Sequence, residues 1–268
     1  MPTHPFAMRH SLLILLLTSP LLAASSVPVL AVSTSPSGQV VAAPVEHSAF
    51  DRLLKKHVNA QGLVNYKSFN TDGKEFNQYR TALGKNAPAA WRSTPGQMAY
   101  WSNACKAYMI RLIQDHYPVK SIKDSGFNIK IPFVTPPGAA EFSSIGGKKM
   151  RPDDIEHGTP RKKCGDPPVP SALVCASSSR PRLRNEAYTA TQLDQQLNKQ
   201  GRDFLSCTSQ HKVGKDAAQL SMYFDSYKGG WNTNGQSVVR WVNRYSPPTM
   251  ANTAKITVLD YNRQLNEQ

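Results

Sequence analysis

The sequence is poor in acidic residues. It has 18 Asp and Glu against 32 Lys and Arg, a formal net charge of +14 over 268 residues. An excess of positive charge favours anionic partners. The basic residues are scattered, however, and no aromatic residues alternate with them as in a surface that stacks nucleic-acid bases. We therefore expect nucleic acid not to be the partner and most of this charge to form a solvated basic face, with an anionic cell-envelope component as the candidate partner.

Long hydrophobic runs are also lacking. The run Leu12–Leu17 follows Arg9 and His10 and precedes small residues around Ala23–Ser26. It is too short to cross a bilayer, which takes roughly 20 residues, but the layout is that of a cleaved secretory signal. An uncleaved amphiphilic anchor is the alternative. A cleaved signal predicts a periplasmic or secreted protein with no transmembrane span in its mature chain.

This interpretation divides the chain into three parts. The residues after the signal are small and contain proline, which is typical of disorder. The remainder is long enough for one sizeable core. We predict a signal peptide at residues 1–31, a disordered lead-in at 32–45 and a single domain at 46–268.

Cysteine is scarce, with four residues at positions 105, 164, 175 and 207. This density is too low for a disulfide scaffold, although an even number in an exported chain permits disulfides. The spacings match no zinc site. The short motifs of serine hydrolases, zinc peptidases and nucleotide-binding loops are absent as well. We therefore expect no metal and no cofactor.

Apolar residues recur at helical spacing over much of the chain. The strongest such segment starts at Thr94, a possible cap followed by Pro95 and Gln97, and ends before Pro118. Helices are expected at residues 49–60, 72–83, 94–117, 189–205, 216–228 and 236–245.

Strand signals are fewer. Ala172–Ala176 is a short apolar run between helix breakers and is predicted to be a central strand. Ile256 and Val258 alternate with polar residues and indicate a late strand, while Asp153–His157 could form a short helix. Loops with short strands are expected over residues 119–149. The fold class is therefore α+β, a mostly helical single domain around a small sheet.

Six segments, taken together, resemble one known family. The resemblance spans about Phe50 to Asn266 and is to the family called domain of unknown function 547 (DUF547). It implies a family domain with no settled biochemical role. The segments are AYWSNACKAYMIRLIQDHYPVKSIKD (99–124), DDIEHG (153–158), DPPVPSALVCAS (166–177), RPRLRNEAYTATQLDQQLNKQGRDFL (180–205), LSMYFDSYKGGW (220–231) and LDYNRQLN (259–266).

The sequence departs from the pattern of the family at positions suited to chemistry. Cys105 stands where the resemblance gives a tyrosine, Pro170 lies where a histidine is expected, and Arg180 replaces a second cysteine ahead of Pro181. A histidine and a cysteine that could react are thus missing. Prolines at 152, 160, 168 and 170 also fit a copy that is decaying under relaxed selection.

The remaining candidates for catalysis are Glu156, His157 and Cys175. A histidine beside a carboxylate can act as a base near neutral pH. A cysteine is a nucleophile only when its thiolate is stabilised, and within an apolar strand it is usually packed and inert. A disulfide between Cys175 and Cys164 is a further alternative. Cys105 lies on an apolar helix face and is expected in the core.

The candidates for binding are Asn103 and three arginines. Asn103 could hydrogen-bond a loop or line a cleft, and the sequence does not decide between the two. Arg180, Arg182 and Arg184 alternate, so an extended segment would place all three on one face, able to bind a phosphate or carboxylate. A solvated rim is the alternative.

Two functions follow from these residues. The first is a non-catalytic binding or scaffold role in the cell envelope, favoured by the missing reactive positions. The alternative is a thiol-dependent hydrolase or transferase, similar to papain or transglutaminase, that uses a cysteine with His157 and Glu156.

Overall fold

The computed structural model describes residues 44–88, 93–121, 143–150, 154, 176–226, 237–247 and 249–268, together with strand residues 33–34 and 40–41. The predicted signal peptide lies outside this part of the chain. So do the first four residues of the predicted central strand Ala172–Ala176.

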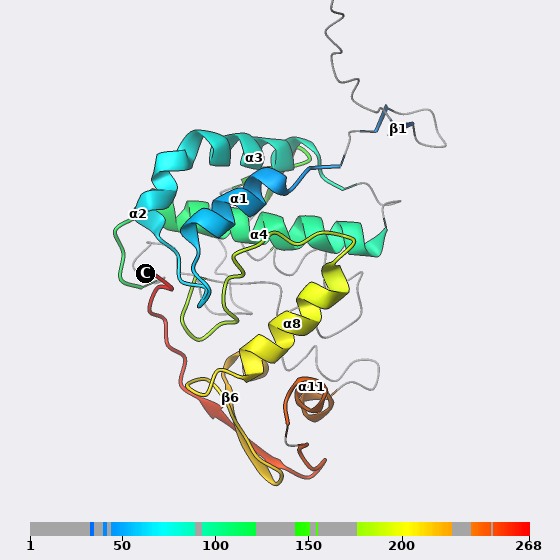
Figure 1. Cartoon of the computed structure of the whole chain (residues 1–268), viewed down its shortest axis with the longest axis vertical. Helices are drawn as coiled ribbons and strands as arrows, with labels where there is room; N and C mark the ends of the chain where they lie inside the picture. The colour runs from blue at the N-terminus through cyan, green and yellow to red at the C-terminus, as the bar shows by residue number, and fades with distance from the viewer. Residues whose placement is uncertain are drawn as a thin grey trace, which may run out of the picture.

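Three helices form the larger part of the molecule (Figure 1). They are α1 (Ser48–His57), α3 (Gly73–Lys85) and α4 (Thr94–His116), and the short α2 (Tyr66–Phe69) and 3-10 helix η1 (Asn70–Asp72) lead from α1 into α3. The cap of α4 is Ser93, whose side chain accepts a hydrogen bond from the backbone of Gly96, one residue before the predicted cap Thr94. Helix α4 ends ahead of Pro118, as predicted.

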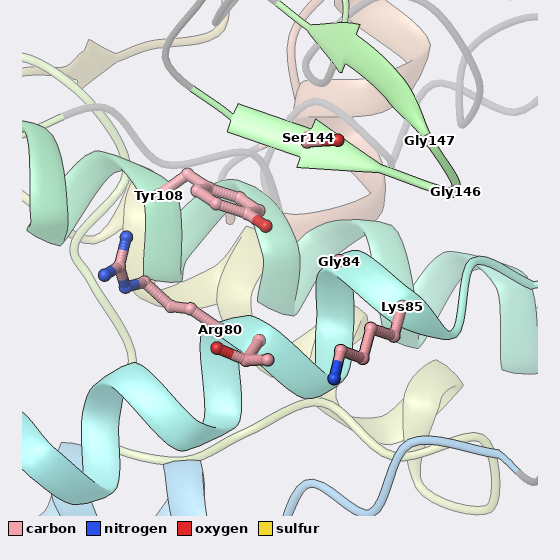
Figure 2. Close-up of a pocket in the computed structure, with 8 residues that line it drawn as sticks. Arg80, Gly84, Lys85, Tyr108, Ser144, Gly146 and Gly147 are labelled. Carbon is pink, nitrogen blue, oxygen red and sulfur yellow. The ribbon is translucent and has the colours of Figure 1, made fainter.

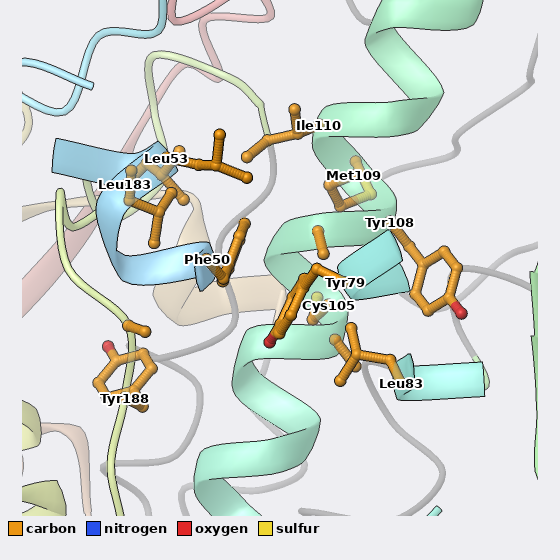
Figure 3. Packing of buried hydrophobic residues seen from close by; sticks show 14 of the residues in the cluster. Phe50, Leu53, Tyr79, Leu83, Cys105, Tyr108, Met109, Ile110, Leu183 and Tyr188 are labelled. Atoms are coloured by element: carbon orange, nitrogen blue, oxygen red, sulfur yellow. The ribbon is translucent and has the colours of Figure 1, made fainter. Parts of the chain in front are cut away.

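The core of this part is built where the apolar faces of α1, α3 and α4 meet (Figure 3). The ring of Phe50 stacks on that of Tyr79, with 4.7 Å between their centroids. Leu183 and Tyr188 from a later, irregular segment pack into the same cluster, and Cys105 is buried in it as expected. Because these residues come from well-separated parts of the sequence, the cluster joins the three helices to residues 183–188.

A second cluster lies between helix α8 (Leu193–Leu205), helix α11 (Val238–Tyr245) and a three-stranded sheet. The sheet has the order β5-β6-β7, in which β5 is antiparallel and β7 parallel to β6. Its strands are β5 (Lys212–Val213), β6 (Ala217–Ser221) and β7 (Lys255–Leu259), and the short helix α9 (Tyr223–Ser226) follows β6.

The predicted helix over residues 216–228 is wrong for its first half, which forms strand β6. Ala218 and Leu220 are buried while Ala217 and Gln219 are exposed, so side chains alternate with the period of a strand. Pairing with β5 on one side and β7 on the other stabilises this conformation. Only α9 is helical among the described residues of that range.

The other five predicted helices and the late strand are confirmed to within a few residues, and so is the fold class: α+β and mostly helical. No helix in the described ranges is both long and apolar enough to cross a bilayer.

Two further pairs of strands are short. Strand β3 (Ser143–Ile145) pairs with β4 (Lys148–Met150) through the turn Gly146-Gly147, in which both glycines have positive φ. Strands β1 (Ser33–Thr34) and β2 (Val40–Val41) form an antiparallel pair within the residues expected to be a lead-in.

The C-terminal residues run alongside three distant segments. The backbone of Asn266 accepts a hydrogen bond from Val64 N at 2.8 Å and donates one to Ala176 O at 3.2 Å. Leu265 N donates to Lys120 O at 3.1 Å. These bonds fix the chain at Ala176, the last residue of the predicted strand that carries Cys175.

Gly62 is expected to tolerate no side chain. Its φ is +81°, and a Cβ there would lie 2.7 Å from Arg182 Cβ and 2.8 Å from Leu183 O. The substitution Gly62→Ala should lower the free energy of unfolding by about 3 kcal/mol, through left-handed strain plus overpacking against backbone. Gly147→Ala is the matched control, because its φ is +75° but its Cβ would meet nothing within 4 Å. Gly147→Ala should lower the free energy of unfolding by about 1 kcal/mol. If urea denaturation gave equal losses for Gly62→Ala and Gly147→Ala, the clash at Gly62 would be contradicted.

Candidate functional site

The three predicted catalytic residues, Glu156, His157 and Cys175, lie outside the described residues, so their roles stay predictions. The four predicted binding residues, Asn103, Arg180, Arg182 and Arg184, are all described. Asn103 and Arg184 contact the loop at residues 186–189, whereas Arg180 and Arg182 line a small pocket.

Asn103 holds a loop in place. Its side chain is fully buried, and both ends of its amide bond the backbone of Tyr188. Nδ2 donates to Tyr188 O at 2.8 Å, and Oδ1 accepts from Tyr188 N at 2.9 Å. Of the two possibilities left open by the sequence, the structure therefore shows the bond to a loop.

The loop at residues 186–189 is buried without regular secondary structure, so its backbone needs side-chain partners. Asp51 on α1 accepts from Ala187 N at 2.9 Å. Gln196 on α8 donates to Ala187 O at 2.9 Å and accepts from Thr189 N at 3.1 Å. Together with Asn103 on α4, these side chains fasten the loop to three helices.

Lys106 is the fourth residue that holds this loop. It is fully buried, donates to Glu186 O at 3.1 Å, and lies 4.1 Å from the ring centroid of Tyr188. Burial, with the nearby charge of Arg184, lowers the pKa of Lys106 to about 7. Sequence reasoning missed this residue. The signal that could have found it is a single lysine inside the apolar run of α4.

The loop forms one wall of a pocket of about 770 Å³, which the start of α1 and the first turns of α4 complete. Its charged groups are largely paired. Lys55 Nζ lies 2.7 Å from Asp51 Oδ2, and the carboxylate of Glu186 pairs with Arg184. A histidine also lines this pocket, and burial determines its protonation state.

That histidine is His47, whose Nδ1 lies 2.8 Å from the hydroxyl of Tyr79. Burial, with the charge of Lys106, lowers the pKa of His47 to about 4. The ring is therefore neutral at neutral pH, and its hydrogen bond goes to a tyrosine that is itself buried in the core. This arrangement suits the recognition of a polar ligand better than proton transfer.

Two of the three alternating arginines point inward. Arg180 is 4% exposed and donates from Nε to the hydroxyl of Tyr261 at 3.2 Å. Arg184 is 8% exposed and pairs with Glu186. The expectation of a solvated rim is therefore wrong for both, because each forms bonds inside the fold. Arg182 is partly exposed.

Arg182 borders a second pocket, of about 370 Å³, that also receives Arg180 and Cys207. Arg182 pairs with Asp203 on α8 and donates to Ala60 O at 3.0 Å. Cys207 carries a free, partly exposed thiol. Ser177, two residues beyond Cys175 in the sequence, is among the residues that line this pocket.

No metal site is evident in the described residues, where no group of three or more His, Cys, Asp or Glu side chains converges. The interior polar groups are used instead to join loops to helices.

The comparisons with known proteins give one match. Residues 89–205 match a family described as "Protein of unknown function, DUF547". The matched range is shorter than the Phe50 to Asn266 range of the resemblance. It includes helix α4 and the 186–189 loop, with Asn103, Lys106 and Gln196. No curated protein and no solved structure matches the chain. Through residues 89–205, this chain belongs to the DUF547 family.

Proposed function

We propose that this DUF547 protein is an exported protein with a non-catalytic binding or scaffold role. The observation that carries the proposal is the way four helix side chains hold the 186–189 loop. Asn103 and Lys106 lie on helix α4, within the range that matches the family, and both are hydrogen-bonded to backbone rather than directed at a substrate.

A preformed pocket supports a binding role. The 770 Å³ pocket has a wall whose backbone is bonded to α1, α4 and α8, so ordering this wall adds no entropy cost when a ligand enters. Its volume is typical of small-molecule sites. The net charge of +14 favours an anionic partner, and an envelope component fits an exported chain.

The proposal predicts that Cys175 does not act as an activated nucleophile. The test is labelling of the reduced, folded chain with an iodoacetamide probe, located by peptide mass spectrometry. A Cys207→Ser background is needed because the thiol of Cys207 is free and partly exposed. Cys105 should react only after unfolding, because it is 4% exposed. We expect Cys175 to label no faster than the unfolded chain does.

The control variant is His157→Ala in the same background. Fast labelling of Cys175 in the folded chain that is abolished by His157→Ala would show an activated thiol and would overturn the non-catalytic role. Export is tested separately by expressing the full chain in a bacterial host and measuring its mass. A full-length chain retained in the cytoplasm would contradict export.

A further inference from the structure

A pocket of about 520 Å³ lies between α3, α4 and the β3–β4 hairpin (Figure 2). The two cations in its lining, Arg80 and Lys85, leave α3 on different sides and do not point toward one another. This pocket therefore does not gather charge for a ligand. Polar groups of the backbone line up instead along one edge of the sheet β5-β6-β7, far from α3 (Figure 1).

Strand β7 forms that edge, and in the described part of the chain it is paired on one side only. It runs parallel to β6, and Lys255 N donates to Asp216 O at 3.0 Å. The backbone groups of successive residues point to opposite sides of a strand, so alternate residues from Lys255 onward face β6. The N–H and C=O groups of Ile256 and Val258 therefore point away from β6, and no other described segment bonds them. We call these the open groups of β7.

The same edge leaves an apolar side chain uncovered. Val258 pairs with Leu220 of β6, whose side chain is fully buried on the core side of the sheet. Val258 lies on that side too, yet it is 44% exposed, because no described strand continues the sheet beyond β7. Edge strands are usually protected by a proline, a bulge or a central charge. The sequence KITVL of β7 has no proline and no charge after Lys255, and its register with β6 is unbroken.

The two ends of β7 carry opposite charges. Lys255 begins the strand and Asp260 directly follows it. Both are exposed, and neither forms an ion pair with any described residue. A second β7 lying antiparallel would bring Lys255 of each copy within one residue of Asp260 of the other, whereas a parallel one would bring like charges together. The edge is therefore complementary in charge to an antiparallel copy of itself.

We propose that two copies of this chain associate through β7, antiparallel and with a two-fold axis at Thr257, into one continuous sheet. In this register Ile256 of each copy lies opposite Val258 of the other, so all the open groups gain hydrogen bonds. The side chain of Val258 is then covered by Ile256 of the second copy. Such an interface is closed and stops at a dimer. It is separate from the pocket at the 186–189 loop and goes beyond the proposed function.

The association is expected to be weak. Two paired strands of five residues bury less than the roughly 1,200 Å² of a standard interface. The open groups are also hydrated in the monomer, so each new bond contributes modestly. We expect a dissociation constant on the order of 100 μM. Sedimentation velocity of the purified chain, between about 10 and 500 μM, measures it.

The variant Val258→Pro tests the backbone pairing. Proline has no N–H and its ring blocks an approaching strand, so dimer affinity should fall about tenfold or more. The monomer should keep its fold, because the N–H of Val258 faces away from β6. Val258→Thr is the matched control: it keeps the N–H and the branched shape and should weaken the dimer less than about threefold. A dimer that is unaffected by Val258→Pro would overturn the proposal.

A charge exchange tests the antiparallel orientation. Lys255→Glu and Asp260→Lys should each weaken the dimer about threefold, because each places like charges at both ends of the strand pair. The double variant Lys255→Glu/Asp260→Lys should restore the affinity to within about twofold. Two independent structural defects would add rather than cancel, so a double variant that is weaker than either single one would overturn this arrangement.

A cysteine on the two-fold axis tests the register. In a Cys207→Ser background, Thr257→Cys should form a disulfide between copies, because facing residues without ladder bonds have Cα atoms about 4.5 Å apart. Gln219→Cys is the control, since it is exposed beside Thr257 but lies on the central strand β6. Peptide mass spectrometry should find the 257–257 link alone. A chain that stays monomeric at every concentration would overturn the proposal, and cross-linking of Thr257→Cys to a different protein in cells would then assign the edge to another partner.

Discussion

Replacing Asn103 with alanine is expected to lower the free energy of unfolding by about 4 kcal/mol, because two buried backbone groups lose their partners at once. The amide of Asn103 bonds both the N–H and the C=O of Tyr188, in a part of the core that the side chain of Tyr188 also fills. Alanine can replace neither bond. The loop at 186–189 would then be held by Asp51, Lys106 and Gln196 alone.

Equilibrium urea denaturation measures this loss, and hydrogen exchange locates it. The peptide that covers residues 184–192 should exchange faster in the Asn103→Ala chain than in the wild type. Asn198→Ala is the control: it removes one bond, from Tyr245 to Asn198 Oδ1 at 3.1 Å, at a half-buried position. It should cost about 1 kcal/mol or less. A loss below about 1 kcal/mol for Asn103→Ala would mean that the loop does not depend on this amide.

The second large effect concerns Lys106 and appears as a dependence of stability on pH. The pKa of Lys106 falls from an ordinary 10.5 to about 7 in the folded chain, through burial. Between these values the unfolded chain holds a proton that the folded chain has released. Raising the pH therefore favours the folded state, by at most about 1.4 kcal/mol per pH unit. Stability should rise by about 3 kcal/mol from pH 7 to 9.5.

The variant Lys106→Met should remove this rise, because methionine has no proton to release. Denaturant midpoints at half-unit steps between pH 6 and 9.5 measure it, with the exposed Lys67→Met as the control that keeps the slope. The rise of stability with pH is expected to end at about pH 10. Burial raises the pKa of Tyr66, Tyr100 and Tyr188, so ionisation of these groups in the unfolded chain favours unfolding above that point. An unchanged slope in Lys106→Met would show that another group causes the rise.

Most helices could be predicted from the sequence because each pairs a continuous apolar face with clear ends. Helix α4 has Pro95 in its first turn and Pro118 just beyond its end, and helix α11 repeats Trp241, Val242 and Tyr245 on its buried face. Strand β6 could not be predicted this way. Its short sequence fits the period of a helix as well as that of a strand. Its partner β7 lies about 40 residues further along the chain.

The candidate site was harder to predict, for a different reason. The loop at 186–189 has no periodicity, so nothing in its own sequence indicates that it is buried. Its burial is set by Asp51, Asn103, Lys106 and Gln196, which come from three helices. The alternation of Arg180, Arg182 and Arg184 would place all three on one face of an extended segment, but it did not indicate that Arg180 and Arg184 are buried.

The C-terminal segment has a consequence for the speed of folding. The hydroxyl of Tyr66 donates to Asn266 Oδ1 at 2.7 Å across a separation of 200 residues, and Gln268 reaches His57 O across 211. Closing such long loops is entropically unfavourable and slows folding, whereas α1, α3 and α4 form contacts that are close in sequence. The helical part is therefore expected to assemble early and the C-terminal segment to dock last, and stopped-flow refolding should show docking as the slower phase.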